Sequence, residues 1–138
     1  MFKGLNWVGV IVSLVFGQVL GYVWWNQLFA KTLAGMMDKS GNMALMMVEG
    51  IVLAAVMLIG IAWVIKSMGE EGYVKGALAG LGLWLFFPAA GYALDYVYMA
   101  GKNQNLLIAN LGYTLIFFMV SGALIAGLKL GKPAAAAA

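Results

Sequence analysis

Long apolar runs alternate with short polar breaks along the chain. Four runs stand out, and they cover residues 5–29, 44–65, 77–99 and 106–128. Each run holds about 22–25 residues, or roughly 33–38 Å of α-helix, which is enough to cross a hydrocarbon core about 30 Å thick. The pattern therefore predicts four transmembrane helices.

The breaks between the runs are short and polar, reading KTLAGMMDKSGN, KSMGEEGYVKG and AGKNQN. Connections of this length force neighbouring helices to run antiparallel. The sequence thus predicts an all-α integral membrane fold, with four transmembrane helices in an up-down-up-down bundle that forms one domain over residues 1–130. Residues 131–138, with Pro133 and five alanines, are expected to be a short tail, disordered or not native.

The first run begins like a secretory signal peptide, with Lys3 ahead of an apolar stretch. However, no small-x-small cleavage site follows, and the run continues into Trp24 and Trp25. We therefore interpret it as an uncleaved first helix.

Composition points to lipid as the solvent. The 138 residues are 64% hydrophobic and 9% charged, with a mean hydropathy of +0.97. Soluble domains are about 45–50% apolar and about 25% charged, and a chain of this length leaves much of its surface exposed. The 19 glycines are typical of closely packed membrane helices.

The same inventory argues against most catalytic chemistry. The chain has no His and no Cys, which are the usual ligands of zinc, haem and iron–sulfur clusters, so we expect no cofactor and no metal. No serine has an evident activating neighbour, so we expect no enzyme. The net charge of +3 is spread over loops and tail, so we expect no nucleic-acid partner.

Lysine placement gives an orientation. An even number of spans puts both chain ends on one side, flanked by Lys3, Lys66, Lys75, Lys129 and Lys132. The other side carries Lys31, Lys39 and Lys102. Because positive residues favour the cytoplasmic side, the bias predicts cytoplasmic termini.

Aromatic residues gather near the end of the first run. Trp and Tyr prefer the headgroup level of a membrane. Tyr22, Trp24 and Trp25 are therefore expected to form an interfacial belt with three tyrosines from the later spans, Tyr92, Tyr96 and Tyr113. The alternative is a lipid or quinone site built on the aromatic face near Trp24.

Two acids fall within predicted spans, Glu49 in the second and Asp95 in the third, near the same membrane face. Ionisable groups inside a span are costly and are functional candidates by default. A candidate polar cluster would join them with Asn26, Gln27, Lys31 and Asn110. The alternative is that each acid only pairs with a loop lysine or bonds a neighbouring Tyr or Asn.

Small residues recur every four positions along the first run, at Gly9, Ser13, Gly17 and Gly21. This spacing predicts a ridge where another backbone approaches closely, and Gln18 beside it is expected to bond across helices. Gly76 and Gly80 in the third run, and Gly127 and Gly131 in the fourth, repeat the spacing.

Pro88 lies inside the third run, in WLFFPAAGY. It removes a backbone hydrogen bond to the carbonyl of Trp84, so we expect a helix kink there. Such a kink could serve gating or only shape the bundle.

Motifs along nearly the whole chain resemble domain-of-unknown-function family 1761, a group of small bacterial membrane proteins. They are the opening Asn6-Trp7, the end of the first run (Gly21, Trp24, Leu28, Phe29, Lys31), the third run (Gly80, Leu83-Trp84-Leu85, Phe87-Pro88) and the fourth (Asn110, Gly112, Tyr113, Gly122). The chain departs from the family pattern at Trp25, Gln27 and Asp95. The resemblance implies a multi-pass protein of the bacterial inner membrane and carries no established activity.

Two functions are compatible with these features. The first is a non-catalytic structural or accessory subunit that packs against other membrane-protein subunits, with the Gly9–Gly21 ridge as the contact. The alternative is a small-solute transporter or channel that self-associates and uses Glu49 and Asp95. Membrane lipids are expected partners in either case.

Overall fold

The computed structural model describes residues 2–35 and 41–128, and the described residues contain helices and no strands. Four helical segments are long and apolar enough to cross a membrane. The first comprises α1 (Trp7–Val23) and η1 (Trp24–Leu28), the second is α3 (Met43–Met68), the third comprises α4 (Tyr73–Trp84), η2 (Leu85–Ala89) and α5 (Ala90–Tyr98), and the fourth is α6 (Gln104–Gly127). The all-helical class and the four helices are confirmed.

Helix ends differ from the predicted runs where charge was read as a break. The third helical segment begins at Tyr73, not at residue 77, and α3 continues to Met68 past Lys66. A lysine near the end of a membrane helix can extend its side chain to the headgroups, so a charged residue need not end the helix. A short helix, α2 (Ala30–Ala34), lies in a segment read as a polar break. Lys39, Lys129, Gly131, Lys132 and Pro133 lie outside the described residues.

Asparagine side chains start three of the helices. The side chains of Asn6, Asn42 and Asn103 accept hydrogen bonds from backbone N–H groups in the first turns of α1, α3 and α6. Asparagine is among the preferred residues at this position because it satisfies donors that the helix leaves unpaired. The turn between α3 and α4 uses Gly69 and Gly72 at positive φ, of 66° and 93°, where a side chain would be strained.

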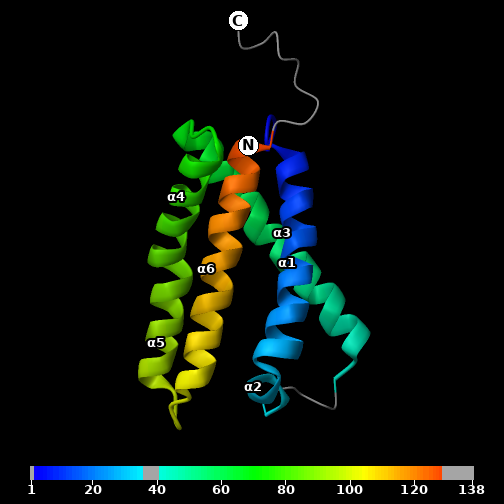
Figure 1. The fold of residues 1–138 in the computed structure, drawn as a ribbon, viewed down its shortest axis with the longest axis vertical. Helices are drawn as coiled ribbons and strands as arrows, with labels where there is room; N and C mark the ends of the chain where they lie inside the picture. Colours follow the sequence, from blue (N-terminus) through cyan, green and yellow to red (C-terminus); the bar gives the residue numbers. More distant parts are fainter. Residues whose placement is uncertain (1, 36–40, 129–138) are drawn as a thin grey trace, which may run out of the picture.

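Helix α6 is the centre of the arrangement (Figure 1). It packs along α4 on one side and α1 on the other, and α3 packs against both α1 and α6. The N-terminus, the end of α6 and the α3–α4 turn lie at one end of the molecule, and the α5–α6 turn lies at the other. The beginning of α3 stands apart from the other helices.

The buried core follows from this arrangement. Phe117, Phe118 and Ile125 of α6 are buried with Leu58 and Ile61, which belong to the second half of α3. The first half of α3 contributes no buried residue. Packing therefore concentrates around α6 and toward the end that carries the N-terminus.

Glycine sets the distance between α4 and α6. A Cβ built on Gly76 would lie 2.2 Å from the carbonyl oxygen of Gly122, and one built on Gly80 would lie 2.1 Å from that of Phe118. Both atoms are backbone atoms, so no side-chain movement relieves the overlap. The two helices thus touch backbone to backbone, as small-xxx-small spacing allows.

Three hydrogen bonds from outside α6 cap its C-terminal end, and we name them together the clasp. The Asn6 side-chain amide donates to the carbonyl oxygens of Ile125 (2.7 Å) and Leu128 (2.5 Å), and the Gly72 N–H donates to the carbonyl of Ala126 (3.0 Å). The last carbonyls of a helix have no partner within it. The Asn6 side chain therefore caps α1 and the end of α6 at once.

Candidate functional site

The small-residue ridge of α1 packs against α6 of the same chain. A Cβ on Gly9 would lie 2.7 Å from Cα of Ile125, and one on Gly17 would lie 2.5 Å from the Phe117 ring. Ser13 between them is fully buried. The expectation that this ridge contacts a partner subunit is therefore wrong, because α6 already covers it.

Gln18 does not join the ridge. Its side chain is exposed on α1, and it makes no hydrogen bond across helices within the described part of the chain. Its position in the sequence is next to Gly17, but the turn of the helix directs the Gln18 side chain outward. Gly21, at the end of the ridge, faces Tyr113, whose hydroxyl lies 3.5 Å from a Cβ built there.

Trp24 holds η1 to α6 with its side chain. Its indole N–H donates to the carbonyl oxygen of Ala109 (3.0 Å), and its ring covers Gly112, where a Cβ would lie 2.8 Å away. Tyr113 makes a second link, with its hydroxyl donating to the carbonyl of Gly17 (3.3 Å). The Trp24 and Tyr113 side chains thus link the first helical segment to α6 by hydrogen bonds.

The aromatic residues expected to form one belt fall into three places. Trp24, Trp25 and Tyr113 form one cluster, in which the Trp25 and Tyr113 ring centroids lie 6.1 Å apart. Tyr22 is 63% exposed on α1. Tyr92 and Tyr96 lie on α5, on the other side of α6.

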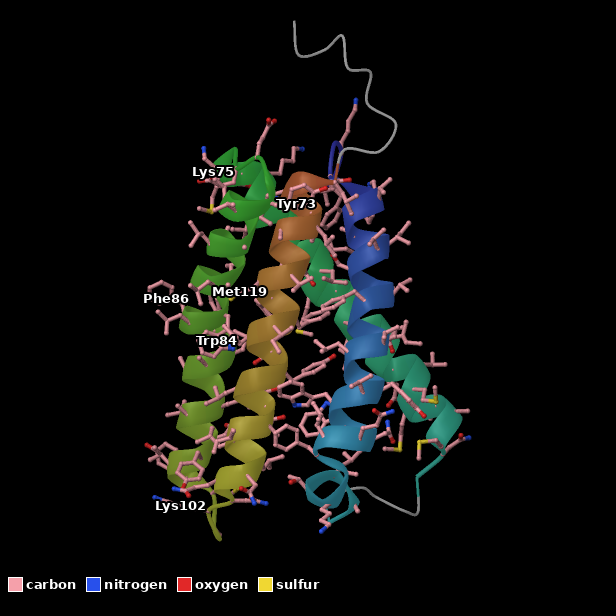
Figure 2. The ribbon with its side chains drawn as sticks, viewed as in Figure 1. Tyr73, Lys75, Trp84, Phe86, Lys102 and Met119 are labelled. Atoms are coloured by element: carbon pink, nitrogen blue, oxygen red, sulfur yellow. The ribbon has the colours of Figure 1, made fainter. Side chains whose placement is uncertain are left out.

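Tyr92 and Tyr96 line a small cavity with Asp95, which we name the Asp95 cavity. It measures about 100 Å³, and α6 contributes its other polar lining group, Asn110, with Asn103 from the turn before it. The Lys102 ammonium lies 5.5 Å from the centroid of the Tyr96 ring. Lys102 lies at the end of the molecule opposite to Lys75 (Figure 2). Asn103 was missed because its position in a polar loop carries no signal.

The remaining members of the predicted polar cluster lie elsewhere. Asn26 and Gln27 are exposed on η1. Lys31 lines a separate hollow with Asn103 and Asn105. Glu49 lies on the first half of α3, away from α5. The structure brings together Asp95 and Asn110, and it does not bring Glu49 to them.

Glu49 belongs to a stretch with unusual exposure. Every residue from 43 to 53 of α3 is exposed, on all faces of the helix. We name this stretch the outer half of α3. Its apolar side chains include Met47, Val48 and Leu53, which are 62%, 57% and 64% exposed. No other described span leaves so long a continuous segment exposed.

Pro88 sits within the π-helical turn η2. Such a turn, like the one at η1, accommodates a local break in the regular hydrogen-bond pattern and is often found at functional sites. The helix continues beyond it as α5, which packs on α6. Within residues 2–35 and 41–128, no three His, Cys, Asp or Glu side chains are grouped as metal ligands are.

The family described as "Protein of unknown function (DUF1761)" matches residues 8–126. This span contains all four helical segments that are long and apolar enough to cross a membrane, apart from Trp7 and Gly127 at the outer ends. No curated protein and no solved structure matches the chain.

Proposed function

Since the chain belongs to the DUF1761 family, as its resemblance to family 1761 predicted, and that family's description names no activity, we propose a function from the geometry. The protein is a non-catalytic accessory subunit that packs against a larger membrane complex, and the outer half of α3 is its docking surface. The observation that carries this proposal is the all-round exposure of residues 43–53 around the acid Glu49.

The membrane gives this exposure its meaning. Lipid tails solvate apolar side chains such as Met47 and Leu53 well, but they solvate a carboxylate poorly. Glu49 lies about 9 Å along α3 from its first residue. An acid costs about 2.5–3.5 kcal/mol at the bilayer centre on insertion scales, and the penalty at the depth of Glu49 is smaller. A protein partner with hydrogen-bond donors at this level would satisfy Glu49, which has no hydrogen bond or ion pair among the described residues.

Side chains of the outer half suit close contact. Gly50 follows Glu49, and a Cβ built on it meets nothing within 4 Å, so a partner backbone has room to approach. Met43, Met46 and Met47 surround this position. Methionine adapts its shape to irregular surfaces, which favours a contact with another protein.

The proposed setting is the bacterial inner membrane, with the four helices running up-down-up-down and both termini cytoplasmic. Lys3, Lys66 and Lys75 mark one end of the described chain, and Lys31 and Lys102 mark the other. The positive-inside rule supports this orientation.

Gentle extraction of native membranes tests the proposal, with native sizing and mass spectrometry of what migrates with the chain. We expect co-migration with one large complex, lost in Gly50→Leu and kept in Gly91→Leu. Both glycines are helical, and a Cβ at either meets nothing within 4 Å, so the variants differ in position alone. A wild-type chain that migrates alone or as a small homo-oligomer would contradict the proposal.

A second candidate, an oligomeric transporter or channel, is favoured by the Asp95 cavity. A carboxylate beside two tyrosine rings is a suitable site for a small ammonium ion. The sequence hypothesis used Glu49 and Asp95 together. Here only Asp95 binds the transported ion, because Glu49 lies away from the cavity. Proteoliposomes loaded with methylammonium would show efflux that Asp95→Asn abolishes and Glu49→Gln preserves; equal efflux from all three would sink this candidate.

A further inference from the structure

An apolar groove runs between α3 and α4, away from the outer half of α3 and from the Asp95 cavity. Two adjoining hollows of about 420 Å³ and 360 Å³ make it up, and they share the lining residues Val64 of α3 and Leu83 of α4. We name them together the α3–α4 groove. Phe118 of α6 and Pro88 line the smaller hollow, which is the one farther from the α3–α4 turn.

One end of the groove is charged and the other is apolar. Glu70 and Lys75 line the end at the α3–α4 turn, where their side chains form an ion pair with N–O distance 3.9 Å. Lys75 stands at the end of the molecule, and Phe86 lies farther along the same side (Figure 2). The smaller hollow has an apolar lining, which includes Met57 and Trp63.

We infer that the α3–α4 groove binds one glycerophospholipid whose headgroup carries both a phosphate and a primary ammonium. The inference requires the membrane location but not the partner proposed above. The groove runs from Lys75 to Pro88, about 20 Å of helix, which matches one leaflet of about 15 Å plus part of its headgroup layer. An acyl chain fills the apolar part.

Charge complementarity selects the headgroup. The lipid phosphate pairs with the Lys75 ammonium, and the lipid ammonium pairs with the Glu70 carboxylate. Each new pair replaces half of the existing ion pair, whose 3.9 Å separation leaves both groups able to accept another partner. A purely anionic headgroup would meet Lys75 favourably but would be repelled by Glu70.

Gly82 offers a way to fill the groove without disturbing the fold. It lines the larger hollow, and a Cβ built on it meets nothing within 4 Å. Gly82→Leu therefore occupies the space of the acyl chain, while the α4–α6 contact at Gly76 and Gly80 stays intact. Gly91→Leu on α5 is the matched control, because it lies outside the groove and is equally unobstructed.

The experiment uses the full chain, delipidated in detergent and exchanged into vesicles of equal parts phosphatidylethanolamine and phosphatidylglycerol. Native mass spectrometry then counts the lipids that stay bound. We expect one phosphatidylethanolamine per chain, retained about tenfold over phosphatidylglycerol, which corresponds to about 1.4 kcal/mol. Gly82→Leu should lose it, Gly91→Leu should keep it, and Glu70→Gln should lose the headgroup preference while still binding lipid.

Thermal unfolding without added lipid shows whether both glycine variants are folded. Added phosphatidylethanolamine should raise the midpoint of Gly91→Leu and leave that of Gly82→Leu unchanged, because a ligand stabilises only the state that binds it. Equal lipid retention by Gly82→Leu and Gly91→Leu would overturn the inference. So would retention without preference between the two headgroups in the wild-type chain.

Discussion

The α4–α6 pair and the outer half of α3 are both built from apolar sequence, yet α4 and α6 touch backbone to backbone while every residue from 43 to 53 is exposed. The difference lies in where the glycines face. Gly76 and Gly80 of α4 meet the backbone of α6 directly, whereas Gly50 of α3 faces open space. Apolar composition puts a helix in the membrane, and the direction of its small residues decides what it packs against.

The largest loss of stability should come from disrupting the contact between α4 and α6. Gly80→Leu places a side chain where the Phe118 carbonyl oxygen lies 2.1 Å from the first added atom. Because the obstructing atom belongs to the backbone, the overlap is relieved only if α4 and α6 move apart. We therefore expect a loss of about 3 kcal/mol or more in unfolding free energy. Denaturant unfolding in detergent measures it, and an unfolding curve like that of Gly91→Leu would contradict the glycine contact.

Gly17→Leu should cost less, although the overlap at this position is also severe. The nearest neighbour of Gly17 is the Phe117 ring, 2.5 Å from a built Cβ, and a side chain can move where a backbone cannot. We expect about 1–3 kcal/mol, measured by the same unfolding. The loss should appear in the purified chain without any partner. A purified Gly17→Leu chain as stable as wild type would instead restore the ridge as a surface for another protein.

Two of the three N-cap asparagines, Asn6 and Asn42, allow the packed end of α6 to be compared with the exposed outer half of α3. Asn6→Ala removes a cap and two hydrogen bonds to the end of α6, so we expect about 2 kcal/mol of destabilisation. Asn42→Ala removes only the cap of the outer half of α3, and we expect about 0.5 kcal/mol. Equal losses in the two variants would show that the clasp at the end of α6 adds no stability.

The smallest effect on the isolated fold should come from the outer half of α3 itself. Glu49→Gln and Gly50→Leu alter exposed residues of α3, so their unfolding free energies should stay within about 0.5 kcal/mol of wild type. Their effect should appear in assembly, as loss of co-migration with the larger complex. A clear loss of stability in the purified chain would mean that the outer half packs against its own bundle.

The sequence predicts the four helices because the length of an apolar run is enough to recognise a helix that could cross a membrane. It also identifies Gly9, Ser13 and Gly17 as one ridge, because helical periodicity places them on one face. It does not identify the neighbour, since a glycine ridge serves a helix of the same chain or of another equally well. That choice depends on the central position of α6, which no local pattern encodes.

The sequence likewise predicts the depth of Glu49 and Asp95 along their helices but not the direction in which each side chain points. Counting residues places Glu49 and Asp95 at similar depths, but their directions around the bundle depend on which helices are adjacent. Trp24 shows the complementary case, because an indole near a helix end suits both a lipid interface and a hydrogen bond to a neighbouring helix. The α3–α4 groove had no sequence signal, since its lining is ordinary apolar sequence from two spans.

Photo-crosslinking in native membranes tests the docking surface most directly. A photoreactive residue at Val48, on the outer half of α3, is compared with one at Val97 on α5; the two side chains are 57% and 61% exposed. We predict one discrete adduct with another membrane protein from position 48 and none from position 97. Adducts with lipid alone, or with a second copy of this chain alone, from position 48 would contradict the account.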